Sequence, residues 1–494
     1  MNIIPLFVAI PLGAAFILAL LGKKETVSDI LVNSAALCLA ILSIVLIPFL
    51  RDNGVFVYTM GGWLPPKGIN LVLDGLSLLM LIVINSIAFF ATLYSVSYMK
   101  RFTAKSRFYS LFMLMVAGMN GVVLTGDFFN LFVFLEIASI ASYALVAFGV
   151  EAEELEAAFK YMVMSSIASI LILFSVGLLY GLTGSLNMAD ISEIIQGKHN
   201  LLLSFSLVLF LAGFGLKAAI IPFHAWLPDA HPSAPAPISA MLSGVLIKAL
   251  GVYTIMRVFF NVYGMNIQLG WTFMILGVIS MVGGGILALR QTDFKRLLAY
   301  SSSSQIGYIL IGLGCGNYWG LLGALFHLFN HATFKALLFL NSGAVEYTTG
   351  TRKLDEMGGL SKVMPVTGTT STIGSLSISG IPPFNGFWSK LFIIIGLIQA
   401  GYLVLAGITV LASVLTLAYY LRVQRFVFFG KLREKWAQIK EVPKVMCVSM
   451  IALAIICIGT GILFYPLIKV ILGPAIAVLQ EGTKYSPLIL GGMK

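Results

Sequence analysis

Charged side chains are scarce in this sequence. Asp, Glu, Lys and Arg make up only 10% of its 494 residues, whereas 59% are hydrophobic. A soluble globular domain carries about 25% charged residues. The composition therefore excludes a soluble enzyme and predicts a chain that crosses a lipid bilayer many times. We expect it in the inner (plasma) membrane of the cell.

Cysteine pairs and nucleotide-binding motifs are also missing. Four cysteines lie apart in apolar runs, without the CxxC spacing of redox or metal sites, at Cys38, Cys315, Cys447 and Cys457. No glycine-rich nucleotide loop or P-loop stands in a usable context. We therefore expect no cofactor, no metal and no catalytic redox site on this chain. Membership of a larger oxidoreductase stays open.

Positive charge exceeds negative charge, with a formal net charge of +11. The basic residues lie in short loops between apolar runs, which indicates membrane topology and not a nucleic-acid-binding face. Clusters follow odd-numbered predicted spans at Lys23 and Lys24, 100–107, 290–296 and 422–440. We predict that their side is cytoplasmic and that both chain ends lie outside. The acidic loop at 151–156 shares this side, but acidic residues weigh little in the rule.

Long apolar runs dominate the rest of the sequence. A membrane-spanning helix needs about 20 mostly apolar residues, and about fourteen stretches meet that length. They lie near 3–21, 28–50, 71–94, 108–126, 129–149, 158–181, 201–221, 236–257, 266–289, 297–315, 318–345, 365–398, 403–428 and 443–473. The loops between them are too short to fold alone. We predict an all-α polytopic membrane protein.

Proline interrupts two of these spans. Pro222 breaks the seventh span soon after Lys217, and Pro382 with Pro383 breaks the twelfth shortly before Lys390. Proline removes a backbone donor and blocks the helix, so the freed backbone must be covered by protein or water. The breaks are five spans apart, so the two elements enter from opposite sides. That arrangement is typical of an inverted repeat.

Ionisable residues at mid-membrane depth are the candidates for function. Glu136 and Lys248 lie midway along the fifth and eighth spans. His327, His331 and Lys335 follow at i, i+4 and i+8 in the eleventh span, which stacks them on one helix face. Intramembrane charges are costly and usually mark an ion path. For any single residue, a structural ion pair or a hydrogen-bonded core histidine is the alternative.

The chemistry of these residues favours protons over sodium. Lysine and histidine take up and release protons, and burial makes release easier. Sodium is a hard cation that prefers oxygen ligands, and Glu136 is the only carboxylate of the sequence clearly at depth. Whether sodium moves through this chain or through a neighbouring subunit stays open, as does the direction of proton flow.

Five segments carry a resemblance to a known family: TGDFFNLFVFLEIASIASY, LKAAIIPFHAWLPDAHPSAPAPISAML, DFKRLLAYSSSSQIGY, HLFNHATFKALLFL and GIPPFNGFWSK. Over roughly residues 70–430 the chain resembles the antiporter-like subunits shared by respiratory complex I, Mrp-type sodium/proton antiporters and membrane-bound hydrogenases. LTGDFFNLFVFLEI and LTGSLNMADI look most like the D-type subunit of Mrp antiporters and its counterpart in membrane-bound hydrogenases.

The resemblance implies a fold of fourteen helices with two inverted five-helix repeats, spans 4–8 and 9–13. It divides the chain into helices 1–3 (1–107), the first repeat (108–260), the second repeat (261–430) and helix 14 with a tail (431–494). It also implies a role for each buried residue. Glu136 and Lys217 would pair at a half-channel entrance, Lys248 and then His327, His331 and Lys335 would connect, and Lys390 would lead outside. Some family members carry Glu at this last position.

The implied function is a proton-translocating subunit of a multisubunit Mrp-type antiporter or hydrogenase-type complex. Its partners would be small Mrp-type subunits, or hydrogenase or oxidoreductase subunits, without nucleic acid. The alternatives are a proton-pumping subunit of a complex I-type NADH or ferredoxin:quinone oxidoreductase, a free-standing secondary solute transporter, and a purely structural subunit. A solute carrier needs a substrate-sized polar pocket, whereas a structural subunit tolerates neutral replacements of the buried residues.

Overall fold

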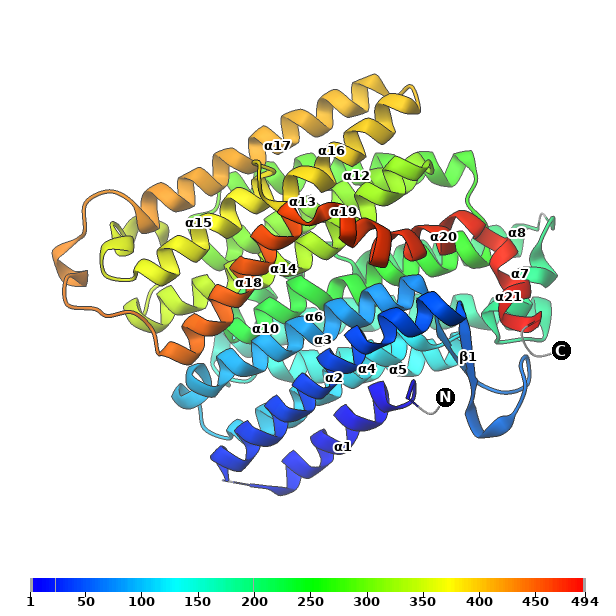
Figure 1. Ribbon diagram of the computed structural model, residues 1–494, viewed down its shortest axis with the longest axis horizontal. Helices are drawn as coiled ribbons and strands as arrows, with labels where there is room; N and C mark the ends of the chain where they lie inside the picture. Colours follow the sequence, from blue (N-terminus) through cyan, green and yellow to red (C-terminus); the bar gives the residue numbers. More distant parts are fainter. Residues whose placement is uncertain (1–2, 23, 199, 492–494) are drawn as a thin grey trace.

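The computed structural model describes residues 3–22, 24–198 and 200–491, so Lys23 of the first basic cluster lies outside the described residues. Helices run side by side along most of the molecule, and both chain ends lie toward the end that carries β1 and α7 (Figure 1). The all-α prediction has one small exception. Two short strands pair antiparallel in the loop before the third span, with Phe56 opposite Leu73 and Thr59 opposite Asn70.

The N-terminal part and the first predicted repeat contain α1 (Leu6–Leu20), α2 (Glu25–Asn53), β1 (Phe56–Thr59), β2 (Asn70–Leu73), α3 (Gly75–Tyr98), α4 (Lys105–Leu124), α5 (Phe128–Val146), α6 (Ala152–Thr183), α7 (Met188–Ile195), α8 (Leu201–Lys217), α9 (Leu227–Ser233), α10 (Ala236–Met241) and α11 (Thr254–Met256). Asn187 begins α7 by accepting hydrogen bonds from the backbone of Ala189 and Asp190. The segments around α11 are π-helical, and one continuous helix runs from Ala236 to Val262.

The second predicted repeat and the C-terminal part contain α12 (Ile267–Leu289), α13 (Phe294–Cys315), α14 (Tyr318–Thr349), α15 (Pro365–Ser379), α16 (Asn385–Gln399), α17 (Leu403–Val423), α18 (Lys444–Ile462), α19 (Phe464–Leu467), α20 (Gly473–Glu481) and α21 (Ser486–Gly491). The stretch predicted as a single last span, 443–473, divides at Leu463. The helical path beyond that point continues along the molecule as α19, α20 and α21 (Figure 1).

Eleven helices of the described residues are long and apolar enough to cross a membrane. The count differs from about fourteen for identifiable reasons. Helices α1 and α8 are apolar but shorter, α15 and α16 are two halves of one interrupted span, and α13 is long enough but contains the polar run Ser301–Gln305. The path Phe464–Gly491 is counted in addition. The count of fourteen and the five-helix repeats remain predictions.

The centre of the bundle consists of two helices that are buried all round. The apolar windows of Ala236–Val262 and of α14 are 100% buried, whereas those of α2, α6 and α17 are 39%, 39% and 33% buried. A helix that is apolar all round belongs in the interior. The partly exposed helices therefore form the lipid-facing shell. The central pair carries Lys248, His327, His331 and Lys335, so these residues are held at the core of the protein.

Matching hydrogen bonds in the two halves support the predicted inverted repeat. Asp127 begins α5 and Asp293 begins α13, each by accepting a bond from a backbone amide three residues later. The backbone amides of Phe128 and Phe294 donate to the carbonyls of Leu186 and Arg352, both at 2.9 Å, and those of Met188 and Leu354 donate to Gly126 (2.9 Å) and Thr292 (2.8 Å). The spacing between each residue and its counterpart is the same throughout. By that spacing, Ser165 and Ser169 of α6 correspond to His331 and Lys335 of α14.

The basic clusters that follow odd-numbered spans gather at one end of the bundle. Contacts between their loops show this: Lys105 with Asp29 (2.8 Å), Arg101 with the Tyr347 carbonyl (3.0 Å), Lys295 with Glu346 (2.7 Å), and Arg433 with the Asp355 carbonyl. The described part of the chain therefore has one strongly basic face. Its assignment to the cytoplasm remains a prediction from the positive-inside rule.

Candidate functional site

Glu136 of α5 and Lys217 of α8 form an ion pair, with 3.6 Å between Oε1 and Nζ. The Lys217 side chain is 3% exposed and the Glu136 side chain 27%. The Lys217 ammonium also donates to Ser139 Oγ (2.9 Å) and Ser165 Oγ (2.5 Å), and the Ser169 hydroxyl donates to Glu136. Two serines thus complete the polar environment that the buried ammonium requires, and the third binds the carboxylate.

The end of α8 positions Lys217 at an interruption of the seventh span. The residues from Ala218 to Trp226, including Pro222, are not helical, and the Trp226 indole donates to the Leu216 carbonyl at 3.0 Å. The Ile221 backbone amide donates to Ser280 Oγ of α12 at 3.0 Å. Side chains therefore satisfy backbone groups that the break leaves free, as non-helical backbone at membrane depth requires.

Lys248 lies at the start of the π-helical segment Lys248–Tyr253 and is fully buried. Its ammonium donates to the Ser243 carbonyl at 2.5 Å. Glycines let this helix approach both neighbours closely, because a Cβ on Gly251 would lie 2.5 Å from Ala218 and one on Gly244 would lie 3.2 Å from the Ala332 carbonyl. The helix of Lys248 therefore joins the break after Lys217 to α14. π-Helical turns are frequent at functional sites.

His327 and Lys335 of α14 have different partners. The ring nitrogens of His327 lie 3.0 Å from Ser389 Oγ and 3.1 Å from Gln305 Oε1. Lys335 donates to the Leu298 carbonyl (2.7 Å) and Ser301 Oγ (2.9 Å), and its Nζ lies 3.3 Å from Tyr420 Oη. No carboxylate stands within ion-pair distance of Lys335 in the described part of the chain. The hydrogen-bond partners of the Lys335 amino group are therefore one carbonyl and two hydroxyl oxygens, all of them neutral.

His331 lies between these two residues on α14. It is fully buried, and neither ring nitrogen has a hydrogen-bond partner among residues 3–22, 24–198 and 200–491. Its ring centroid lies 6.3 Å from that of His327. The predicted stacking of His327, His331 and Lys335 on one face thus places all three in the interior, with His331 free to accept or donate a proton.

Lys390 of α16 follows the second interrupted span. Helix α15 ends at Ser379 and α16 begins at Asn385, with Pro382 and Pro383 between them. The Lys390 Nζ lies 3.4 Å from the Ser379 carbonyl and 4.6 Å from the centre of the Tyr308 ring. The Tyr308 ring centroid lies 5.4 Å from that of His327. Lys390 is therefore linked to α14 through one tyrosine.

Six of the seven predicted residues are buried in the bundle, and Glu136 is partly exposed on its flank. We term these seven residues the buried row. Short contacts connect Glu136 with Lys217, and His327 with Lys390 through Tyr308, whereas packing of the Lys248 helix connects the two halves. Their roles in transport remain a prediction.

Sequence reasoning missed the hydroxyl groups along this row. Ser165 and Ser169 stand at i and i+4 of one span, and Ser139 stands three residues after Glu136. Ser301–Gln305 forms a polar run within another span. Polar residues in the middle of an apolar span were the available signal, because such groups need partners inside the protein. His231, inside a quoted motif, was also missed.

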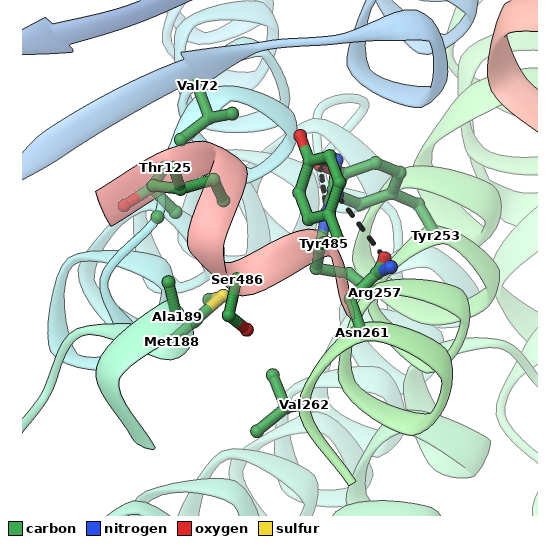
Figure 2. Close-up of a pocket in the computed structure, with 12 residues that line it drawn as sticks. Val72, Thr125, Met188, Ala189, Tyr253, Arg257, Asn261, Val262, Tyr485 and Ser486 are labelled. Atoms are coloured by element: carbon green, nitrogen blue, oxygen red, sulfur yellow. Dashed lines mark hydrogen bonds between the residues drawn. The ribbon is translucent and has the colours of Figure 1, made fainter. Parts of the chain in front are cut away.

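A second buried charged cluster lies at the end of the bundle that carries the chain termini. Arg257 Nη2 lies 2.7 Å from Asp74 Oδ2, and the Tyr485 hydroxyl donates to the same carboxylate. Asn261 donates to the Val478 carbonyl at 2.8 Å. Figure 2 shows Arg257, Tyr253 and Tyr485 beside one another in a pocket against the C-terminal segment. The cluster fastens that segment to the helix that carries Lys248.

No group of three or more His, Cys, Asp or Glu side chains in the described ranges could hold a metal ion. The buried groups are suited instead to holding and passing protons, since lysine, histidine, serine and tyrosine all exchange them. Together the bundle, its two interrupted spans and the buried ionisable row define a polytopic membrane protein of the ion-transporting class.

Comparisons with known proteins identify the family. Residues 125–416 match the family described as NADH:quinone oxidoreductase/Mrp antiporter, TM, and residues 63–109 match NADH-ubiquinone oxidoreductase (complex I), chain 5 N-terminus. The N-type subunit of the NADH-quinone oxidoreductase of Desulforudis audaxviator is 35% identical over 478 residues, which cover 93% of this chain and 94% of the relative. The D-type subunit of the Na⁺/H⁺ antiporter of Alkalihalophilus pseudofirmus is 35% identical over 410 residues, which cover 82% and 83%.

Two solved structures share the fold along the whole chain. A chain of the Mrp complex from Dietzia sp. has a TM-score of 0.93 at 26% identity, covering 99% of this chain and 100% of that one. A chain of the membrane-bound sulfane sulfur reductase, an archaeal respiratory membrane complex, has a TM-score of 0.91 at 32% identity with the same coverage. The chain belongs to the NADH:quinone oxidoreductase/Mrp antiporter family of antiporter-like membrane subunits. The expected resemblance, the all-α membrane fold and the membrane location are confirmed, whereas the number of helices and the repeats remain predictions.

Proposed function

We propose that this chain moves protons across the membrane through the buried row from Glu136 to Lys390. The observation that carries the proposal concerns the four buried lysines of the row, Lys217, Lys248, Lys335 and Lys390. Among the described residues only Lys217 of these four has a carboxylate partner, whereas the buried Lys105 and Lys295 outside the row are both paired. A buried ammonium without an opposite charge is costly, so lysines held by hydroxyls and carbonyls are suited to alternate between charged and neutral forms. A structural role alone gives no reason for placing them there.

The geometry supports a sequence of proton positions. Lys217 holds a proton beside Glu136, and the close packing of Gly251 on Ala218 brings the helix of Lys248 to that point. His331 and His327 offer exchangeable ring nitrogens on α14. Lys390 then stands at the second break, where the Ser379 carbonyl and its neighbours have left the helical pattern and can meet water.

We further propose that a neighbouring membrane subunit covers Glu136. Glu136 shares its helix face with Val133 and Ile140, which are 38% and 61% exposed on the flank of the bundle. A carboxylate facing lipid at this depth is costly, so a partner with polar or basic groups fits the site better than lipid. The relatives from the antiporter and from the oxidoreductase are named as subunits of larger assemblies, which supports such a partner.

The test is proton transport in vesicles that contain the parent complex. Lys390→Ala removes the last amino group before the second break, and transport should fall by about a hundredfold or more if proton transfer through it is required. Assembly should be intact, because no ion pair of Lys390 is lost. A correctly assembled Lys390→Ala complex that transports normally would contradict the proposal. Co-purification of the partner subunits serves as the control for assembly.

A second parent complex is favoured by one finding, the 35% identity to a subunit of an NADH-quinone oxidoreductase. In that case the chain would be the proton-pumping subunit of a quinone-reducing complex and not part of a cation/proton antiporter. Purification of the tagged chain from its native membrane separates the two. Co-purified iron–sulfur subunits would favour the oxidoreductase, and small membrane subunits without redox centres would favour the antiporter.

A further inference from the structure

His231 is a buried histidine that the proposed row does not use. It lies in α9, the short helix after the first break, and its carbonyl accepts a hydrogen bond from Ser239 Oγ at 2.9 Å. The side chain is fully buried, and both ring nitrogens lack partners among the described residues. An unpaired buried polar group lowers stability. We therefore looked for a function that would explain why His231 is placed there.

A cavity of about 300 Å³ borders the chain directly after His231. Pro232, Ser233, Ala234 and Pro235 form one wall of it. The charged side chains that line it are Glu151, Glu153, Glu154, Glu346, Lys295 and Arg352. We term this cavity the acidic vestibule, because carboxylates outnumber cations around it. Its volume is sufficient for several water molecules.

The acidic vestibule opens at the basic end of the bundle. Tyr98 and Phe102, on either side of the short 3₁₀ helix Met99–Arg101, line it. Within it, Lys295 pairs with Glu346 at 2.7 Å and donates to the Ala234 carbonyl at 3.1 Å. The vestibule thus offers carboxylates that can gather protons from water, beside a lysine that touches the segment next to His231.

The inner side of His231 faces the buried row. Its ring stacks on Phe339 of α14, with 4.5 Å between centroids. The Lys335 ammonium lies 5.9 Å from the centre of the same Phe339 ring. The residues directly after His231 thus form the vestibule wall, and its ring packs on Phe339, which also contacts Lys335 of the row.

We propose that His231 passes protons between the acidic vestibule and Lys335. A proton from vestibule water binds one ring nitrogen, and the other ring nitrogen gives up its proton to the neutral amine of Lys335, directly or through one water. The imidazole then returns to its starting tautomer by turning its ring. No electrons move, and one proton enters for each one that leaves. Phe339, which packs against both groups, limits free passage of water between them.

This inference rests on the proposed function and is tested in the assembled complex. His231→Gln keeps a polar side chain of similar size but cannot carry a proton, so proton transport should fall by about tenfold or more. His224→Gln is the matched control, because His224 lies in the same break but packs toward Tyr300, with 6.0 Å between ring centroids. An equal loss in both variants would show that damage to the break is responsible, and normal transport by His231→Gln would overturn the relay.

Two further variants separate the relay from the proposed function. If Lys390→Ala stops transport while His231→Gln does not, the row stands and the relay is wrong. Ser233→Cys places a thiol in the vestibule wall without changing a charged residue. A cationic, membrane-impermeant thiol reagent should then block transport when added from the vestibule side, with the unsubstituted complex as control. Full transport after complete labelling would overturn the vestibule as the route.

Discussion

At the residue scale, the Glu136–Lys217 pair is unequal in its surroundings. The lysine is enclosed by Ser139 and Ser165, whereas the glutamate is partly exposed on the flank of the bundle. Glu136 can therefore respond to a neighbouring subunit while Lys217 stays in place. An opposite charge stabilises a buried ammonium. Drawing Glu136 away leaves an uncompensated buried charge, which costs several kcal/mol and favours release of the proton toward Lys248.

This asymmetry makes Glu136→Gln the most direct test of the pair as a switch. Glutamine keeps the shape and removes the charge, so proton transport should fall by about a hundredfold or more while the complex still assembles. Glu136→Asp should retain part of the activity, since the charge survives on a shorter side chain. Both are measured as proton uptake into vesicles, with thermal stability recorded beside it. Wild-type transport by Glu136→Gln would show that the pair is structural.

The seven ionisable residues could be predicted from the sequence because a charge inside an apolar span stands out against its neighbours. The groups that hold them could not. Ser139 and Ser165 are common residues in membrane helices, and nothing local shows that they point at Lys217. His231 could not be predicted to be buried, because its burial depends on Phe339, a residue far away in the sequence.

At the element scale, the helix Ala236–Val262 is held at both ends. Ser239 bonds the His231 carbonyl near its start, and Arg257 pairs with Asp74 of the α3 cap near its end. Asp74 also accepts from Tyr485, so the C-terminal segment is part of this anchor (Figure 2 shows Tyr485 beside Arg257). Lys248 lies between these two contacts, which fix its position along the long axis of the bundle.

We predict that Arg257→Met destabilises the protein strongly, because the fully buried Asp74 loses its counter-charge. Removing one partner of a buried pair costs about 3–5 kcal/mol, and Tyr485→Phe should cost about 1.5–3 kcal/mol for one hydrogen bond to a charged group. Thermal unfolding of the purified complex measures both. Arg51→Met is the control, since Arg51 and Asp52 form a pair with side chains 75% and 61% exposed, which contributes little. Equal effects at both sites would contradict the anchor.

The spans themselves could be predicted from hydropathy, but their interruptions and pairing only in part. The prolines gave the two breaks. The β1–β2 pairing within one loop and the π-helical turns of the Lys248 helix were not predicted. The repeat was visible in retrospect: Thr-Gly-Asp-Phe at 125–128 and Thr-Asp-Phe at 292–294 begin equivalent helices with equivalent hydrogen bonds. At the constant spacing of the repeat, Gly126 corresponds to Thr292, so only Asp-Phe is identical and the match is too short to be noticed in the sequence.

At the scale of the whole molecule, charge is distributed unequally between the two ends of the bundle. Loops with Lys105, Arg101, Lys295 and Arg433 contact one another at one end, and both chain termini lie toward the other (Figure 1). Basic loops remain on the cytoplasmic side during insertion. The acidic vestibule opens at that same end, so the two features together predict that protons exchanging through His231 come from or go to the cytoplasm.

The orientation is tested by labelling single cysteines in intact cells. Lys105 is a poor position, because it is buried against Asp29 at 2.8 Å, whereas Lys100 is exposed in the neighbouring turn. A Lys100→Cys variant should therefore resist a membrane-impermeant thiol reagent in intact cells and react in inverted vesicles. Lys198→Cys, in the exposed turn after α7, should show the opposite pattern. Reaction of the Lys100 variant from outside would reverse the orientation. The vestibule would then face the exterior, and protons relayed by His231 would enter or leave there.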